Sequence, residues 1–292
     1  MVDRAQTAFR TRTGIIALAF ALAFASACIA GAATDSQGRG AYANVNGIRM
    51  YYETYGPAQG IPLVLLHGGG STIDSNFGRI LPFFSRRVIA IEEQAHGRTG
   101  DRNAPVRFET SADDVAALLD QLKVKQADLF GFSNGASVAL QVVIRHPQAV
   151  HKLIFASSIT KKEGAQPQLW TLIRSADIAN MPQALKDAFL KVNPDPAKLQ
   201  NMHDKDAERM RNFRDVPDAD LRAIHTPTLI VTGDRDIVRL EHAVELTQLI
   251  PNARLLVLPG GHGDYLGEAA SPQRSRAPEL TAGLIGEFLD AQ

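Results

Sequence analysis

The feature that most constrains the fold is a short apolar run that ends in a turn containing two glycines and a serine. Residues 127–132 read Ala-Asp-Leu-Phe-Gly-Phe, and Ser133 and Gly135 follow before small and apolar residues resume at helical spacing. This pattern predicts a strand, a very tight turn and a helix, with Ser133 at the turn. Gly131 and Gly135 leave out side chains where the strand and the helix approach closely. The following helix directs its first amides and its positive dipole end toward a developing oxyanion, so Ser133 is predicted to be a nucleophile.

The first 32 residues have the pattern of a secretory signal peptide. Arg4, Arg10 and Arg12 precede an almost wholly apolar run over 14–27, and small residues follow. The run is shorter than the roughly 20 residues that a membrane-spanning helix needs, so cleavage near residue 27 or 32 is predicted rather than an anchor. We therefore expect the protein to be exported, either to the periplasm or into the medium.

Cys28 is the chain's one cysteine, which excludes an intramolecular disulfide. Ser26-Ala27-Cys28 resembles a bacterial lipoprotein cleavage site, although Ala25 stands where leucine is usual. A membrane partner is predicted only if Cys28 is lipidated.

The charge balance argues against a nucleic-acid partner. The 292 residues carry 31 Lys and Arg against 31 Asp and Glu, so no bulk field recruits a polyanion. The histidines show no metal-binding spacing, and no glycine fingerprint for a phosphate or a dinucleotide is present. The sequence therefore predicts neither a metal nor a cofactor.

Apolar runs alternate with helical patterns along the chain. Two β-rich runs joined by Asn46-Gly47 predict a hairpin. Further strands are predicted at 61–66, 87–91, 127–132, 152–156, 228–231 and 254–258, and helices at 241–250, at 277–289 and up to Leu122 with Ser111 as its cap. This alternation predicts an α/β fold, with a mainly parallel open sheet covered by helices on both faces.

Strand character disappears over residues 160–225. This stretch is polar, helical and dotted with prolines, and it carries Trp170 and several methionines. We interpret it as an inserted helical lid, which divides the core into a first part at 41–159 and a second part at 226–292.

The strand at 61–66 runs into His67 and three glycines. Glycines there let backbone amides face a site that side chains would obstruct. The loop resembles the H-G-G-G oxyanion loop of esterases and lipases, which implies oxyanion donors at Gly69 and at Asn134, the residue after the nucleophile. His67 is interpreted as a structural histidine that holds this loop.

The order Ser133, Asp236, His262, together with the glycine loop and the helical insertion, resembles the α/β-hydrolase superfamily over about residues 41–290. The resemblance implies that Ser133 is the nucleophile, that His262 is the general base and then the acid, and that Asp236 orients the imidazole. The sequence departs from the common pattern at 92–99 and in the residues that flank the serine.

The acid and the base each have a competitor. Asp234 and Asp236 both follow the strand at 228–231, and the position counted from Gly233 in the family favours Asp236. His262 lies in a glycine-flanked turn after the last strand, whereas His96 follows an earlier strand end and remains an open alternative. The other histidines are expected to be solvated: His146, His151, His203, His225 and His242.

A serine nucleophile favours acyl transfer to water over the reactions of dehalogenases and epoxide hydrolases, which use a carboxylate. The apolar lid indicates an uncharged, fairly hydrophobic ester or lactone as substrate, in a pocket expected to involve Gly70, Phe132 and Trp170. The predicted activity is therefore that of a carboxylic ester hydrolase. Two alternatives stay open: a cofactor-free haloperoxidase and a ligand receptor that hydrolyses slowly.

Overall fold

The computed structural model describes residues 38–271 and 275–291. All described residues belong to one compact unit. The predicted signal peptide and Cys28 lie outside the described residues. Within the described ranges, no helix combines the length and the apolar character that crossing a membrane requires.

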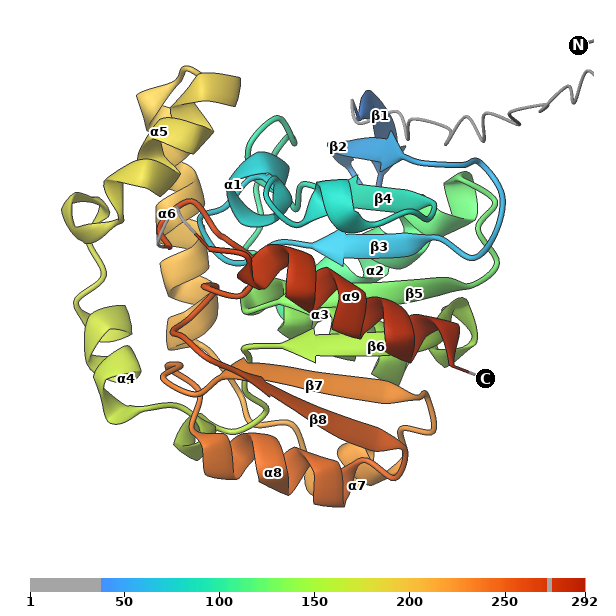
Figure 1. The fold of residues 1–292 in the computed structure, drawn as a ribbon. Helices are drawn as coiled ribbons and strands as arrows, with labels where there is room; N and C mark the ends of the chain where they lie inside the picture. Colours follow the sequence, from blue (N-terminus) through green and yellow to red (C-terminus); the bar gives the residue numbers. More distant parts are fainter. Residues whose placement is uncertain (1–37, 272–274, 292) are drawn as a thin grey trace, which may run out of the picture. The chain divides into compact units, whose positions relative to one another are not determined.

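The described chain forms one eight-stranded sheet with the order β1-β2-β4-β3-β5-β6-β7-β8 (Figure 1). β1 and β2 form the antiparallel hairpin, β2 joins β4 antiparallel, and all other neighbours pair in parallel. The strands are β1 Arg39–Val45, β2 Ile48–Tyr55, β3 Leu63–Leu66, β4 Val88–Ile91, β5 Ala127–Phe132, β6 Val150–Ala156, β7 Thr228–Gly233 and β8 Ala253–Leu258. The predicted mainly parallel α/β fold is confirmed.

The hairpin turn follows from its sequence. Asn46 and Gly47 have φ values of 45° and 85°, which is the left-handed region that a two-residue hairpin turn demands.

The helices are α1 Ile73–Phe77, α2 Phe108–Gln121, α3 Asn134–Arg145, α4 Pro167–Arg174, α5 Gln183–Val192, α6 Pro196–Arg211, α7 Asp218–Arg222, α8 Leu240–Leu249 and α9 Ala277–Asp290. The predicted cap at Ser111 is wrong, because α2 begins at Phe108 with Arg107 as its N-cap. Phe108 packs edge-to-face against Phe213, a contact from a distant segment that fixes the first turn earlier than local sequence indicates.

Two apolar layers cover the sheet, one on each face. On β3, Val64 and Leu66 pack with α2, α3 and α8, whereas Leu63 and Leu65 pack with α1 and α9. Side chains on a strand alternate between faces, so a continuous apolar run supplies both layers. Figure 1 shows α9 crossing in front of the sheet, with α2 and α3 behind it.

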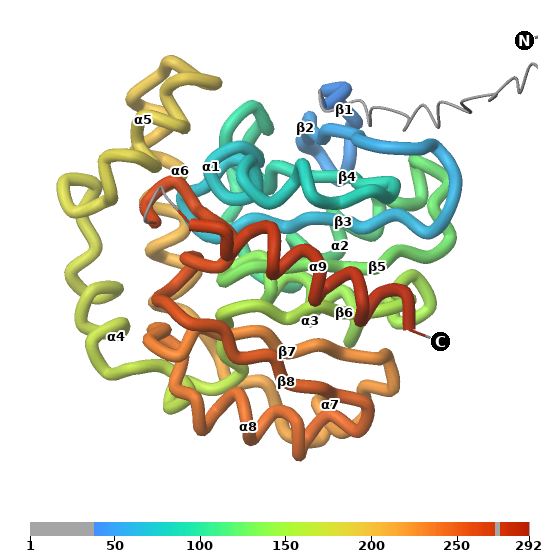
Figure 2. Tube along the Cα trace, viewed as in Figure 1, coloured from blue at the N-terminus to red at the C-terminus, as the bar shows by residue number. Residues whose placement is uncertain are grey.

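The helices of the lid lie beyond the carboxyl ends of the parallel strands. Figures 1 and 2 show α4, α5 and α6 together at that edge of the sheet, far from the amino ends. The longest, α6, begins with Pro196 and is capped by Asp195, which accepts a hydrogen bond from the Ala197 amide. The last helix of the predicted lid range, α7, contacts α8 of the core instead.

Candidate active site

The turn between β5 and α3 holds Ser133 in an uncommon conformation. Its φ is 54° and its ψ is −121°, and its amide donates to the Ala156 carbonyl oxygen at 2.8 Å. A Cβ on Gly131 would stand 2.3 Å from the Gly135 carbonyl oxygen, and one on Gly135 would stand 2.1 Å from the Leu66 carbonyl oxygen. Both positions therefore require glycine, and the strain at Ser133 exposes its hydroxyl at the strand end.

Three side chains from three strand ends form a hydrogen-bonded chain. His262 Nε2 lies 3.1 Å from Ser133 Oγ, and His262 Nδ1 lies 2.8 Å from Asp236 Oδ1. The loops that carry them follow β5, β7 and β8, whose carboxyl ends meet at one edge of the sheet. This arrangement lets the imidazole accept the serine proton while the carboxylate holds the ring.

The carboxylate of Asp236 is buried and supported by hydroxyl groups. Ser157 Oγ donates to Asp236 Oδ2, and the hydroxyl of the fully buried Tyr265 lies 2.6 Å from Ser157 Oγ. Burial by itself raises the pKa of Asp236, but the hydrogen bond and charge of His262 outweigh it and lower that pKa to about 2. Burial also opposes the imidazolium, yet Asp236 prevails and raises the pKa of His262. Sequence analysis missed Ser157 and Tyr265, because neither lies in a recognisable motif.

The structure places Asp236, and not Asp234, beside His262. Asp234 Oδ1 instead accepts a hydrogen bond from the Gly260 amide at 2.8 Å and so holds the loop that leads to His262. One aspartate thus faces the imidazole and the other faces the backbone.

In the glycine loop after β3, two backbone amides are held by side chains and the amide between them is not. The Gly68 amide donates to Asn76 Oδ1 at 2.7 Å, and the Gly70 amide donates to Asp206 Oδ2 at 2.7 Å. Within residues 38–271 and 275–291, the amides of Gly69 and Asn134 donate to no protein acceptor. These two amides are the predicted oxyanion donors, and the Asn134 amide opens helix α3.

The two histidines beside this loop are fixed in different charge states. His67 Nδ1 donates to the Gly68 carbonyl oxygen at 2.8 Å, while Nε2 accepts from the Glu93 amide at 3.1 Å, so the ring is neutral. Burial and the neighbouring His96 lower the pKa of His67 to about 4. The expected structural role of His67 fits these contacts.

His96 faces an acceptor on each side. Its Nδ1 lies 3.0 Å from the Gln94 carbonyl oxygen, and its Nε2 lies 2.9 Å from Asp206 Oδ2, so both nitrogens donate. Burial opposes this cation, but the charge of Asp206 outweighs it and raises the pKa of His96. The open alternative of His96 as the base fails, because its ring is committed to Asp206.

Two lid residues complete a buried charged cluster. Asp206 Oδ1 accepts from Arg209 at 2.6 Å, and Arg209 also donates to Glu93 Oε2 at 2.9 Å. We call His96, Glu93, Asp206 and Arg209 the buried quartet; its formal charges cancel. Sequence analysis missed the two lid members. A signal existed, because Leu199 and Met202 place positions 206 and 209 on the same inward face of α6.

A cavity of about 420 Å³ opens beside the glycine loop and Asn134. Gly69 and Gly70 line it, as do apolar lid side chains: Leu172, Ile173, Met181, Leu185, Met202 and Met210. The expectation for Gly70 therefore agrees with its position. The expectations for Phe132 and Trp170 are wrong for this cavity.

Phe132 and Trp170 each pack against another aromatic ring outside this cavity. Phe132 is buried beneath the site, with its ring centroid 4.7 Å from that of His262. Trp170 donates to the Lys162 carbonyl oxygen and packs against Phe213, in an apolar cluster with Ile159 and Val238.

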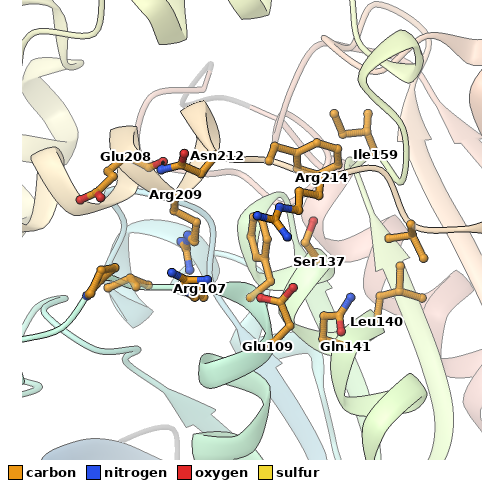
Figure 3. Close-up of a pocket in the computed structure, with 15 residues that line it drawn as sticks. Arg107, Glu109, Ser137, Leu140, Gln141, Ile159, Glu208, Arg209, Asn212 and Arg214 are labelled. Carbon is orange, nitrogen blue, oxygen red and sulfur yellow. Dashed lines mark hydrogen bonds between the residues drawn. The ribbon is translucent and has the colours of Figure 1, made fainter.

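A second cavity of about 200 Å³ lies between α2, α3 and the last turn of α6 (Figure 3). Its polar lining includes Arg107, Glu109, Ser137 and Arg214, and Ser137 stands one turn after the nucleophile. Cations and anions are mixed at this opening, which gives it no preference for ligands of one sign.

Of the remaining histidines, His203 lines the larger cavity, whereas His146, His151, His225 and His242 are not among its lining residues. The expectation that His242 is solvated is wrong, because it is buried and accepts a hydrogen bond from the Thr160 amide at 3.1 Å. Within the described part of the chain, no group of three or more histidine, cysteine or carboxylate side chains is arranged to hold a metal ion.

Comparison with known proteins places this geometry in context. Residues 61–201 match the family model for the alpha/beta hydrolase fold. A 2-hydroxymuconate semialdehyde hydrolase from Pseudomonas sp. strain CF600 is 28% identical, over 79% of this chain and 87% of that protein.

Two solved structures superpose over most of the chain. Est816, an N-acyl homoserine lactone degrading enzyme, is 27% identical with a TM-score of 0.66, covering 85% of this chain and all of that one. A 2-hydroxy-6-oxo-6-phenylhexa-2,4-dienoate hydrolase from Rhodococcus sp. strain RHA1 is 21% identical with a TM-score of 0.73, covering 87% of this chain and 99% of that one. The second likeness shows the fold alone.

Proposed function

The chain belongs to the α/β-hydrolase superfamily, and on that premise we propose that it hydrolyses carboxylic esters or lactones of uncharged, fairly hydrophobic small molecules. The observation that carries the proposal is the chain of hydrogen bonds Ser133–His262–Asp236 beside two unengaged amides and an apolar cavity. Each part corresponds to one requirement of acyl transfer to water.

The reaction proceeds in two halves on these residues. Ser133 Oγ attacks the acyl carbon while His262 Nε2 takes its proton, and the carbonyl oxygen becomes an oxyanion between the Gly69 and Asn134 amides. His262 then returns the proton to the departing alcohol, which leaves an acyl group on Ser133. Water attacks this ester with His262 again as base, and the acid is released.

The charges around the larger cavity favour a neutral substrate. Its ionisable lining consists of Asp177, Asp206 and His203, with neither lysine nor arginine among the described residues that line it. A substrate carboxylate would meet two aspartates and neither lysine nor arginine among these lining residues, and burial of an unpaired charge is costly. This feature supports esters and lactones over the 2-hydroxymuconate semialdehyde and the phenylhexadienoate that are named for two of the similar proteins.

The test is a panel of p-nitrophenyl esters with acyl chains of two to twelve carbons. We expect turnover that improves with chain length up to the capacity of the cavity, and an ω-carboxylate ester of matched length at least about tenfold poorer in kcat/KM. A fluorophosphonate should label Ser133 in the same preparation. Labelling without ester turnover would favour the receptor alternative, and equal or better turnover of the carboxylate ester would contradict the neutral-substrate assignment.

We also propose that the protein is exported, on the basis of the basic, apolar and small-residue pattern of residues 1–32. Intact-mass analysis of the protein recovered from its native host should show a mature chain that starts near residue 28 or 33. Recovery of a cytoplasmic form that retains Arg4 and Arg10 would overturn this.

A further inference from the structure

The loop that presents the Gly69 amide is anchored from two directions. Asn76 of α1, which belongs to the core, holds the Gly68 amide, and Asp206 of α6, which belongs to the lid, holds the Gly70 amide. Because both flanking amides are engaged, the direction of the Gly69 N–H depends on both anchors. Gly70 has φ of +71°, a conformation that glycine adopts readily and that leaves the loop pliable without external support.

We propose that Asp206 is a positioning residue for oxyanion stabilisation, which makes the oxyanion hole complete only when helix α6 of the lid is docked. This inference rests on the proposed acyl-transfer function. Asp206 acts through Gly70 and does not itself touch the reacting atoms. Its carboxylate nevertheless lies close, since a Cβ on Gly69 would stand 3.0 Å from Asp206 Oδ2.

A carboxylate beside an oxyanion hole would oppose the developing negative charge unless cations neutralise it. The quartet supplies two cations, because His96 and Arg209 each donate to a different oxygen of Asp206. The two cations lower the pKa of the Asp206 carboxyl, although burial opposes them, so it stays ionised and keeps accepting from Gly70. The quartet thus holds the loop with a strong charge-assisted hydrogen bond while leaving little net charge near the oxyanion.

The quartet also couples lid and core in a single cluster. His96 and Glu93 follow β4, whereas Asp206 and Arg209 lie on α6. Three of the four residues are at most 4% exposed and Asp206 is 9% exposed. Undocking α6 would separate His96 and Glu93 from their ion-pair partners and Gly70 from its acceptor, so docking of the lid and anchoring of Gly70 occur together.

The first experiment compares Asp206→Asn with Asp204→Asn. Asp204 lies on the same helix, but its side chain is exposed and its polar partners are Gln200 and His203. On a neutral p-nitrophenyl ester, Asp206→Asn should lower kcat by about 100-fold with KM changed less than about threefold, because a mispositioned donor affects the transition state more than the ground state. Asp204→Asn should match the wild type.

A boronic acid separates positioning from a merely structural role. Its tetrahedral adduct with Ser133 places an oxygen in the oxyanion hole, so its affinity should fall in parallel with kcat in Asp206→Asn. An increase of KM without loss of kcat, or unchanged affinity for the boronic acid, would overturn the proposal. If the wild type turns over no ester, the proposed function is refuted. The hydrogen bond between the Gly70 amide and Asp206 is then tested by the second experiment alone.

The second experiment has its decisive outcome in the wild type, so it does not depend on a variant that folds; Asp206→Asn adds a comparison. Hydrogen exchange of the full wild-type chain, read at single residues by fragmentation mass spectrometry, should show slow exchange at the Gly68 and Gly70 amides and fast exchange at Gly69. In Asp206→Asn, Gly70 should become fast while Gly68, held by Asn76, stays slow. Gly70 exchanging as fast as Gly69 in the wild type would contradict the anchor.

Discussion

The triad and the oxyanion loop stand side by side at the carboxyl edge of the sheet, yet they are held in different ways. The side chains that hold the triad come from the core: Ser157 and Tyr265 hold Asp236, which holds His262. The oxyanion loop has one support in the core and one in the lid. The difference teaches that the nucleophile is assembled independently of the lid, whereas stabilisation of the oxyanion depends on it.

The largest effect that tests this comparison is on the nucleophile. Ser133→Ala removes the attacking oxygen but no lid contact, so kcat should fall by roughly 10⁵–10⁶ while the fold is retained. The loss of fluorophosphonate labelling, read by intact mass, checks the assignment. A label that persists would mean that another residue is the nucleophile.

The second-largest expected effect on turnover comes from replacing the acid of the triad, Asp236. Asp236→Asn keeps the shape of the side chain but favours the wrong imidazole tautomer, and turnover should fall by about 10⁴. Asp234→Asn is the matched control, since Asp234 binds only the loop amide of Gly260, and it should cost less than about tenfold in turnover and lower the melting temperature slightly. The reverse pattern at equal folded fraction would assign the acid to Asp234.

A smaller effect compares the two anchors of the loop directly. Asn76→Ala frees the Gly68 amide from the core side and should lower kcat by about 100-fold. Trp170 is the chain's only tryptophan and lies on α4 of the lid, so its emission reports lid docking. Emission should stay at the wild-type wavelength in Asn76→Ala and shift in Asp206→Asn; a shift in both would show that the two anchors are not independent.

The smallest effect concerns pH. Catalysis needs the neutral imidazole, and Asp236 raises the pKa of His262, so kcat/KM should rise with pH through a midpoint above 6.5. Asp236, with a pKa of about 2, stays ionised throughout this range. In Asp236→Asn the midpoint should move to lower pH, since the charge that favours the imidazolium is gone. Asp206→Asn should leave it in place, because the side chains that hold the triad come from the core.

Most of the fold follows from local patterns in the sequence. Continuous apolar runs such as Leu63–Leu66 require burial on both faces, and the Asn46-Gly47 turn fixes the hairpin. The glycines around Ser133 define the strand, the turn and the helix with the serine at the apex. These features are encoded within a few residues of one another, so they can be recognised without knowing the tertiary structure.

Which of several candidate residues belongs to the site depends on tertiary packing, which the sequence does not show. Nothing near Asp234 and Asp236 in the sequence shows that one faces the Gly260 amide and the other His262. Trp170 was expected in the pocket because it is an aromatic residue of the lid, but it contacts Phe213 and Lys162 in a separate apolar cluster.

By itself, the sequence determined the class of fold, the serine on its strained turn and the loops at the ends of the strands. Only the tertiary structure brought Asp206 and Arg209 of the lid to His96 and Glu93 of the core, more than a hundred residues away along the chain. Charged residues on an inward helix face indicate a buried partner but do not identify it, because ion pairing depends on distance in space and not on spacing in sequence. The charge state of His96 and the anchoring of Gly70 therefore became visible only in the folded chain.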